Sequence, residues 1–353
     1  FSIRPSMADT PVVQLLRQLM EIPSVSEEEQ KIGIFLSKYL ENLGYTVELI
    51  PITPDSDRCN VYAYLGTDRK GRTCMTSHMD TVPPHIDFII EGDIIYGRGA
   101  CDDKGPLAAQ ITAAEELRAE RAVKDGDISL LFVVGEEKGG PGMLAVNDMN
   151  LSWEAIMFGE PTEGKLAVGH KGHFVFELFA RGFASHSGYP EKGKNAATTL
   201  VTLLDELKSL NLPTSELLGP TTFNLGKIQG GVAYNILAVD AYALCGIRVA
   251  TNLEEIEKKV AEVVKKYPDV TLKKSFGYPE TYLDYEIEGL DSMPVSFGTD
   301  IPRLKGNHKR YLYGPGSILH AHGVNEQVAI PDLIESVAVY KRLVLASLEK
   351  NTQ

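Results

Sequence analysis

The sequence predicts an α/β protein in which a mixed, mostly parallel sheet lies between helices and is interrupted by a smaller α+β domain. Three observations lead to this fold class. Helical and strand patterns alternate in the first half, the pattern changes after residue 172, and short strands return from about residue 280 before a long final helix. With 353 residues the chain is long enough for two domains. The predicted boundaries are 1–172 with 280–353 for the main domain and 173–279 for the inserted one.

The first helix is expected to begin at Pro11, because proline fits the first helical turn and apolar residues then recur on one face. Ser26 followed by Glu29 reads as a capping box for a second helix, which Gly44 closes. We then expect three short strands at 45–50, 61–65 and 73–77, a helix at 105–121 and an apolar strand at 128–134.

The inserted domain has a different texture. Its expected elements are a strand, a helix, two strands and a helix, at 174–181, 195–210, 221–229, 236–248 and 253–267. This order is typical of an antiparallel sheet with two helices on one face. The last helix of the chain is expected to begin near Pro331.

Charge and composition exclude several classes of protein. Lys and Arg total 35 against 48 Asp and Glu, which leaves a formal charge of −13 and disfavours nucleic acid or an anionic membrane as partner. No apolar run approaches the roughly 18 residues that a membrane span needs. Four cysteines are too few for a disulfide scaffold, and their spacing leaves free thiols and bridges equally open. Residues 1–7 lack the apolar core of a signal peptide, so we expect either an intracellular protein or a leader removed before this numbering.

Histidines and carboxylates, the residue types that commonly bind metal ions, follow several predicted strands. The first are His78 and Asp80. Residues two apart in an extended chain point to one side, so the carboxylate can orient the imidazole ring. Asp102 and Asp103 stand between glycines and a helix, where negative charge is favoured, although Asp103 is also suited to be a simple helix cap.

Two more carboxylate motifs and a histidine pair complete the series. Glu136 and Glu137 end the apolar strand 128–134 and point in different directions, so that one can bind a metal while the other accepts a proton. Glu160 follows another short apolar run. His320 and His322 lie just before the final helix.

These motifs, in this order, resemble the M20 family of metallopeptidases and amidohydrolases, which includes acetylornithine deacetylase, succinyl-diaminopimelate desuccinylase, aminoacylase-1 and glutamate carboxypeptidase. The resemblance covers residues 12–348 and implies a zinc-exopeptidase-like catalytic domain with an inserted lid or dimerisation domain. Within the family, "SHMDTVPP", "GEEKGGPGM", "FGEPTE" and "YGPGSIL" resemble secreted fungal probable carboxypeptidases.

The resemblance assigns roles to the motif residues. It implies two Zn²⁺ per chain, replaceable by Co²⁺ or Mn²⁺, with Asp102 as the bridging carboxylate. It also implies that Asp80 orients a ligand ring and that Glu136 acts as general acid and base on a metal-bridging hydroxide. The remaining implied metal ligands are His78, Glu137, Glu160 and His322, with His322 fitting the family pattern better than His320.

Further implied site residues concern the substrate. His186, in "ASHSG", matches the histidine that helps to stabilise the tetrahedral oxyanion and that dimeric relatives receive from the partner subunit. Asn235 and Arg248 match substrate-holding positions, and the planar fork of Arg248 suits a free carboxylate. Relatives often have Asp where this chain has Gly246, which leaves a surface strand charge as the other interpretation of Arg248. Thr299 is a further expected substrate contact.

The predicted function is therefore amide hydrolysis next to a free carboxylate, as a carboxypeptidase on short peptides or acyl amino acids. The alternatives are an N-acyl amino acid deacylase, such as an acetylornithine deacetylase, and a non-catalytic metal-binding or dimerisation homologue. A dinucleotide-binding oxidoreductase is disfavoured further, because no GxGxxG fingerprint follows the first strand. The expected partner is a second copy through the inserted domain, without nucleic acid or membrane. The resemblance favours secretion, with a cytoplasmic location as the alternative.

Overall fold

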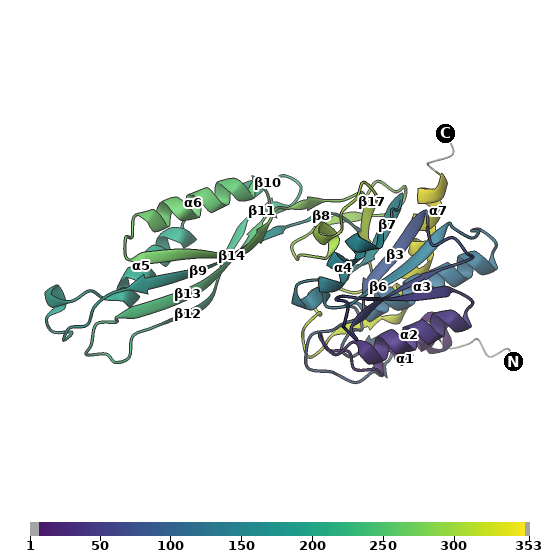
Figure 1. Cartoon of the computed structure of the whole chain (residues 1–353), viewed down its shortest axis with the longest axis horizontal. Coiled ribbons are helices and arrows are strands. Elements are labelled where there is room, and N and C mark those ends of the chain that lie inside the picture. The colour runs from purple at the N-terminus through teal and green to yellow at the C-terminus, as the bar shows by residue number, and fades with distance from the viewer. Residues whose placement is uncertain (1–6, 350–353) are drawn as a thin grey trace. The chain divides into compact units, whose positions relative to one another are not determined.

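The computed structural model describes residues 7–349, which form two compact units (Figure 1). Unit 1 comprises the described chain up to Val168, then Leu283–Met293, then the described residues from Thr299 onward. Unit 2 comprises Gly169–Tyr282 and Pro294–Gly298. The segment before Met7, where no leader pattern is expected, lies outside the described residues.

A six-stranded mixed sheet forms the centre of unit 1, as the sequence predicts. Its strands, in spatial order, are β1 (Thr46–Pro51), β2 (Cys59–Tyr64), β6 (Ile128–Val133), β3 (Thr73–His78), β7 (Ala155–Gly159) and β17 (Lys309–Tyr313). The pairings from β6 to β17 are parallel, and the other two are antiparallel. β6 and β3 are both buried along their whole length, and the nearly continuous apolar sequence of β6 is typical of such a strand.

Helices pack on this sheet. The long ones are α1 (Pro11–Met20), α2 (Gln30–Asn42), α3 (Lys104–Ala119) and α7 (Ile330–Glu349), and α4 (Pro141–Val146) is short. α3 packs against α1, α7 and β3, while α2 packs against β1 and β2. The expected apolar face of α1 is buried in this core. Single turns of 3₁₀ helix, η1 to η5, occupy Met7–Asp9, Glu136–Lys138, Asn147–Met149, Pro190–Lys192 and Ile301–Arg303.

Two further three-stranded sheets are present. One consists of β15 (Thr281–Tyr282), β8 (Leu166–His170) and β16 (Ser292–Val295), and the other of β18 (Gln327–Ala329), β5 (Ile94–Tyr96) and β4 (Ile89–Glu91). Within unit 1, the Leu283 backbone N–H donates to the Val168 carbonyl at 3.2 Å. The chain therefore returns to unit 1 beside the point where it left.

Unit 2 is an antiparallel sheet with two helices. The strand order is β12 (Thr222–Gly230), β13 (Asp240–Val249), β9 (Gly172–Arg181) and β14 (Val270–Tyr278), and α5 (Ala196–Lys208) and α6 (Leu253–Lys265) pack against it. A two-residue pair, β10 (Thr214–Ser215) and β11 (Gly219–Pro220), lies between α5 and β12 in the chain. Side chains of β9 and β13 alternate between buried and more exposed, so one face is covered and the other is open.

Two local predictions differ from the structure. The capping box is wrong, because the Ser26 hydroxyl donates to Asp80 at 2.7 Å and α2 begins at Gln30 without a side-chain cap. The expected strand 236–248 begins only at Asp240, since residues 236–239 form no strand.

The structure also bears on the cysteines and on the possibility of a membrane-spanning helix. All four cysteines, Cys59, Cys74, Cys101 and Cys245, are free of disulfides. Among the helices formed by residues 7–349, none combines the length and apolarity that a bilayer crossing needs.

Candidate metal centre

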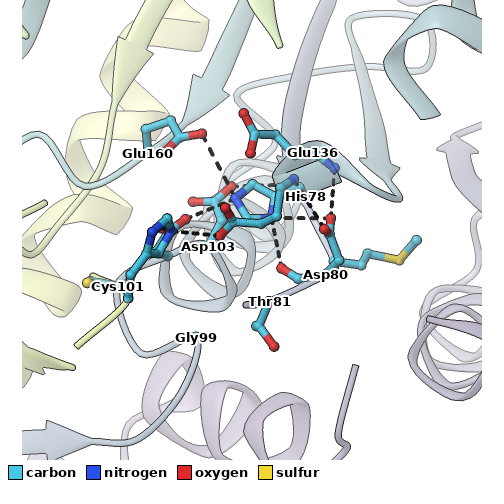
Figure 2. A network of polar contacts seen from close by, with 12 residues as sticks. His78, Asp80, Thr81, Gly99, Cys101, Asp103, Glu136 and Glu160 are labelled. Carbon is cyan, nitrogen blue, oxygen red and sulfur yellow. Dashed lines mark hydrogen bonds and ion pairs between the residues drawn. The ribbon is translucent and has the colours of Figure 1, made fainter. Parts of the chain in front are cut away.

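Three adjacent parallel strands bring carboxylates and a histidine to one edge of the unit 1 sheet (Figure 2). His78 ends β3, Glu136 follows β6 in the turn η2, and Glu160 follows β7 directly. The carboxyl ends of neighbouring parallel strands meet at the same sheet edge, which is where open α/β sheets place ligand sites. The short loops after these strands therefore bring together residues that are up to 82 positions apart in the chain.

Asp102 lies between two histidines. Its Oδ1 atom is 3.0 Å from Nε2 of His78, and its Oδ2 atom is 3.1 Å from Nε2 of His322. The side chain is only 5% exposed. A carboxylate whose two oxygens face different imidazoles has the arrangement that a bridging ligand requires.

His322 also faces a second carboxylate, because its Nε2 atom lies 2.9 Å from Oε1 of Glu137. The His322 side chain is 52% exposed and its backbone is left-handed, with φ of 64°. His320, the other histidine of this segment, instead contacts the amide of Gln327 at 3.2 Å. Of the two histidines, His322 is the one that the fold brings to the cluster.

Asp80 is fully buried beside His78 and is held by several donors. Nδ1 of His78 contacts the Asp80 backbone carbonyl at 2.8 Å and its Oδ1 atom at 3.5 Å. The Asp80 carboxylate also accepts the backbone N–H groups of Glu136 at 3.0 Å and Glu137 at 3.3 Å. Asp80 thus links the His78 ring to the turn that carries both glutamates.

Glu136 and Glu160 lie on the other side of His78. The Glu160 Oε1 atom is 3.9 Å from Nε2 of His78, and donor atoms of these two residues and Glu136 all lie within 4.8 Å of one another. A second group within the same limit contains His78, Asp102 and Glu137. Glu136 is expected as a base that binds no metal, but its carboxylate is close enough to His78 and Glu160 to bind the same ion.

Burial and mutual charge shift the pKa of nearly every group in the cluster. Burial raises the pKa of Glu136 and Glu160 well above the usual range, and the neighbouring carboxylates of Asp300 and Asp102, respectively, raise it further. Hydrogen bonds with Asp102 and Glu137 raise the pKa of His322 to about 10. For Asp102, burial opposes ionisation, but hydrogen bonds with both histidines outweigh it and hold the pKa below its usual range.

This donor set fits divalent cations. It offers the imidazoles of His78 and His322 and several carboxylates, the nitrogen and oxygen ligands that Zn²⁺ takes in catalytic sites. Buried carboxylates that repel one another are costly unless a positive charge neutralises them. One or two cations bound among these atoms would remove that cost.

Thr299 and the adjacent Asp300 line a small cavity together with His78, Glu136 and Glu160. The Thr299 hydroxyl accepts the Ile301 backbone N–H at 3.2 Å. Asp300 is 5% exposed, and burial raises its pKa to about 7, with Arg303 nearby opposing that shift. Thr299, expected as a substrate contact, therefore lies in the same unit as the metal-type residues and beside them.

The remaining expected site residues belong to unit 2. His186 is exposed, and its Nδ1 atom accepts the Gly188 backbone N–H at 3.1 Å. Asn235 is exposed on the loop between β12 and β13, and its carbonyl accepts the Ser187 N–H at 3.0 Å. Arg248, near the end of β13, is half-buried opposite His173 of β9.

Three acids in or around the cluster have contacts that sequence reasoning did not predict. The Asp103 carboxylate accepts the His78 backbone N–H at 3.1 Å and so braces β3 rather than capping α3. Asp300 and Glu326 are buried acids in loops, and no period or spacing distinguishes them from solvated residues.

Comparisons with family models, protein sequences and solved structures all point to one peptidase family. The model of peptidase family M20/M25/M40 matches residues 74–346. A peptidase M20 domain-containing protein of Schizosaccharomyces pombe is 47% identical over 96% of this chain and 85% of its own length. A probable carboxypeptidase of Aspergillus flavus is 39% identical, with 96% of this chain and 91% of the relative covered. Among solved structures, the aminopeptidase PepT from Bacillus cereus superimposes with a TM-score of 0.80 at 22% identity, over 96% of this chain and 98% of that one.

The chain therefore belongs to peptidase family M20, as its motifs predict. Its fold is that of M20 peptidases, and it is a metal-dependent hydrolase of this family.

Proposed function

We propose that this protein is a di-zinc carboxypeptidase that cleaves the amide bond next to a free carboxylate in short peptides or acyl amino acids. The observation that carries the proposal is Asp102, whose two oxygens each contact a different histidine at about 3 Å. In this arrangement Asp102 would bridge the two ions. His78 and Glu160 would hold one of them, and His322 and Glu137 the other.

Bound zinc would polarise the scissile carbonyl and lower the pKa of a nucleophilic water. The other roles fall to the chain's own residues. Burial keeps the proton affinity of Glu136 high, which suits a group that takes a proton from water and passes it to the leaving amine. Asp80 would hold the His78 ring in place from the side away from the metals, as carboxylates beside ligating histidines do.

Arg248 would bind the free carboxylate of the substrate. Among the described residues it has neither an ion pair nor a side-chain hydrogen bond, so its guanidinium is available to a ligand. The Arg248 charge acts on two neighbouring basic groups. Burial is the main cause of the lowered pKa values of His173 and Lys171, and the positive charge of Arg248 lowers them further. The name probable carboxypeptidase of the Aspergillus flavus relative agrees with a carboxylate-directed site.

The geometry of unit 2 supports a homodimer. His186 and Asn235 lie on loops bridged to each other beside Asp240, where β13 begins, whereas Arg248 lies near the end of that strand. Eight residues of extended strand span roughly 27 Å, too far for one small substrate to touch both ends. We therefore propose that His186 and Asn235 serve the site of a second copy, whose own Arg248 binds the substrate.

The test is a joint measurement of metal content and activity. Protein stripped with a chelator is titrated with Zn²⁺ and assayed on dipeptides, N-acetyl amino acids and the same dipeptides with C-terminal amides. Activity should return as about two Zn²⁺ bind per chain, and only substrates with a free carboxylate should be cleaved. Cleavage of N-acetyl amino acids alone would favour the deacylase, and zinc binding without cleavage of any substrate would favour a non-catalytic homologue.

A further inference from the structure

A buried ion pair, Arg98 with Glu326, lies beneath the metal centre. Nη1 of Arg98 is 2.7 Å from Oε2 of Glu326, and both side chains are almost completely buried, at 1% and 0% exposure. Burying two charges is expensive, and such a pair contributes little net stability unless further hydrogen bonds satisfy it.

The pair connects three segments that carry metal-type residues. Oε1 of Glu326 accepts the backbone N–H groups of Gly99 at 2.9 Å and Asp102 at 3.2 Å. Arg98 donates to the carbonyl of Pro84 at 3.1 Å and to that of Gly323 at 3.0 Å. Gly323 directly follows His322, and Pro84 lies six residues after His78, so the pair links the backbone of Asp102 to the backbone beside His322 and to the loop that follows β3.

His322 depends on this link more than the other expected ligands do. It is half exposed, and residues 323–325 after it are also exposed. His78, by contrast, is held by β3 and by two buried aspartates. The Arg98 bond to Gly323 and the Glu326 bond to Asp102 therefore connect the His322 loop to the backbone of the expected bridging carboxylate.

We propose that Arg98 and Glu326 are positioning residues that set the affinity of the metal site formed by His322 and Glu137, while leaving the His78 and Glu160 site largely unaffected. The inference rests on the two-metal centre proposed above. It assigns the buried charges a registry role, which is the best-attested use of such pairs.

The test is Co²⁺ binding to metal-free protein, followed by calorimetry and by the visible spectrum of the bound ion. Glu326→Gln keeps an oxygen that can accept the Gly99 and Asp102 N–H groups but removes the charge that Arg98 pairs with. We expect the weaker of the two Co²⁺ sites to lose about 10- to 100-fold in affinity, and the tighter site to change only a few-fold. Glu326→Ala, which also loses the acceptor, should weaken the second site further.

Glu48→Gln is the matched control. Glu48 lies on β1, the edge strand of the six-stranded sheet, and accepts a hydrogen bond from Arg69. This substitution should leave both Co²⁺ affinities unchanged. Equal weakening of both sites by Glu326→Gln, or no change in either, would overturn the proposal. If Glu326→Gln fails to fold, Arg98→Lys carries the same expectation, since a single ammonium cannot reach Glu326, Pro84 and Gly323 as the guanidinium does.

The order of measurement separates this inference from the function on which it rests. Wild-type protein is titrated first, and fewer than two bound Co²⁺ per chain would contradict the two-metal centre itself. Two sites in the wild type with a uniform response in the variants would contradict only the role of the ion pair.

Discussion

Glu136 and Glu137 are adjacent in the chain, yet their carboxylates have different surroundings. Glu137 contacts His322 directly, at 2.9 Å. Glu136 makes no such contact and faces the cavity lined by Thr299 and Asp300, where burial and the Asp300 charge keep its pKa high. This difference fits a division of labour between a ligand and a proton carrier.

Glu136→Gln should lower kcat by about 10²- to 10⁴-fold while metal content stays near two per chain, because the amide cannot accept the proton. Steady-state kinetics with metal analysis on the same sample checks this. Glu163→Gln, an exposed glutamate after β7, is the control and should behave as wild type. Loss of one metal equivalent in Glu136→Gln would instead identify Glu136 as a ligand alongside His78 and Glu160.

The pH dependence of metal binding follows from His322. Hydrogen bonds with Asp102 and Glu137 raise its pKa to about 10 in the metal-free protein, so the ring is protonated at neutral pH. A metal ion must displace that proton, and Co²⁺ affinity at this site should therefore rise about tenfold for each pH unit between pH 6.5 and 8.5. Calorimetric titrations at three pH values test this, and a flat profile would mean that His322 is not a ligand.

The raised pKa of His322 also determines how its contribution to folding stability changes with pH. A histidine whose folded-state pKa lies above its unfolded value stabilises the fold fully below about pH 6.5, and that contribution is lost as pH rises through the folded pKa. The buried carboxyls of Glu136 and Glu160, with raised pKa values, act in the same direction. The metal-free protein should thus unfold more easily at pH 9 than at pH 6, as urea titrations would show.

At the scale of elements, two helical glycines have opposite surroundings. A Cβ at Gly33 in α2 would lie 3.8 Å from the Cys59 carbonyl, an ordinary contact. A Cβ at Gly105 in α3 would lie 2.3 Å from the Ala100 carbonyl, which belongs to the loop carrying Asp102. Only the second position needs glycine for space.

Gly33→Ala should therefore stabilise the protein by roughly 0.5–1 kcal/mol, through the entropy lost by the unfolded chain. Gly105→Ala should destabilise it by roughly 1–3 kcal/mol and should also weaken metal binding, because the backbone beside Asp102 must move. Urea denaturation of the metal-free variants measures both effects. Equal effects of the two substitutions would show that the Asp102 loop adjusts freely.

Most elements could be predicted because their signals are local. The continuous apolar run of β6 and the periodic apolar face of α1 each extend over a whole element. β14 was missed, since lysines at 273 and 274 and a bulge interrupt its alternation. The capping box failed because Ser26 has a better partner in Asp80, 54 residues away.

The candidate site was predictable to a similar degree and for a related reason. His78, Asp102 and Glu137 stand in motifs after strands or before a helix, so fold topology alone brings them to one edge. Asp300 and Glu326 are isolated acids in loops, and their importance comes from burial and from contacts made across long stretches of sequence. Such contacts have no counterpart in spacing.

At the scale of the whole molecule, the proposed dimer makes a quantitative prediction. If His186 acts on the site of a partner, a His186→Ala chain and a Glu136→Ala chain, each inactive alone, should complement one another. After unfolding and refolding of a 1:1 mixture, half of the dimers are mixed and each contains one complete site. The mixture should therefore recover about a quarter of wild-type activity. Recovery of no activity, with mixed dimers verified by a tag, would show that His186 acts within its own chain.

The return of the chain to its point of departure has a consequence in polymer terms. Because Leu283 is hydrogen-bonded to Val168, residues 169–282 form, for unit 1, a loop whose ends already touch. The entropy of closing such a loop grows only with the logarithm of its length, by about 0.6 kcal/mol for each doubling. The open sheet face and the loops of unit 2 can therefore vary in sequence and size at little cost to the strands that carry the candidate metal centre.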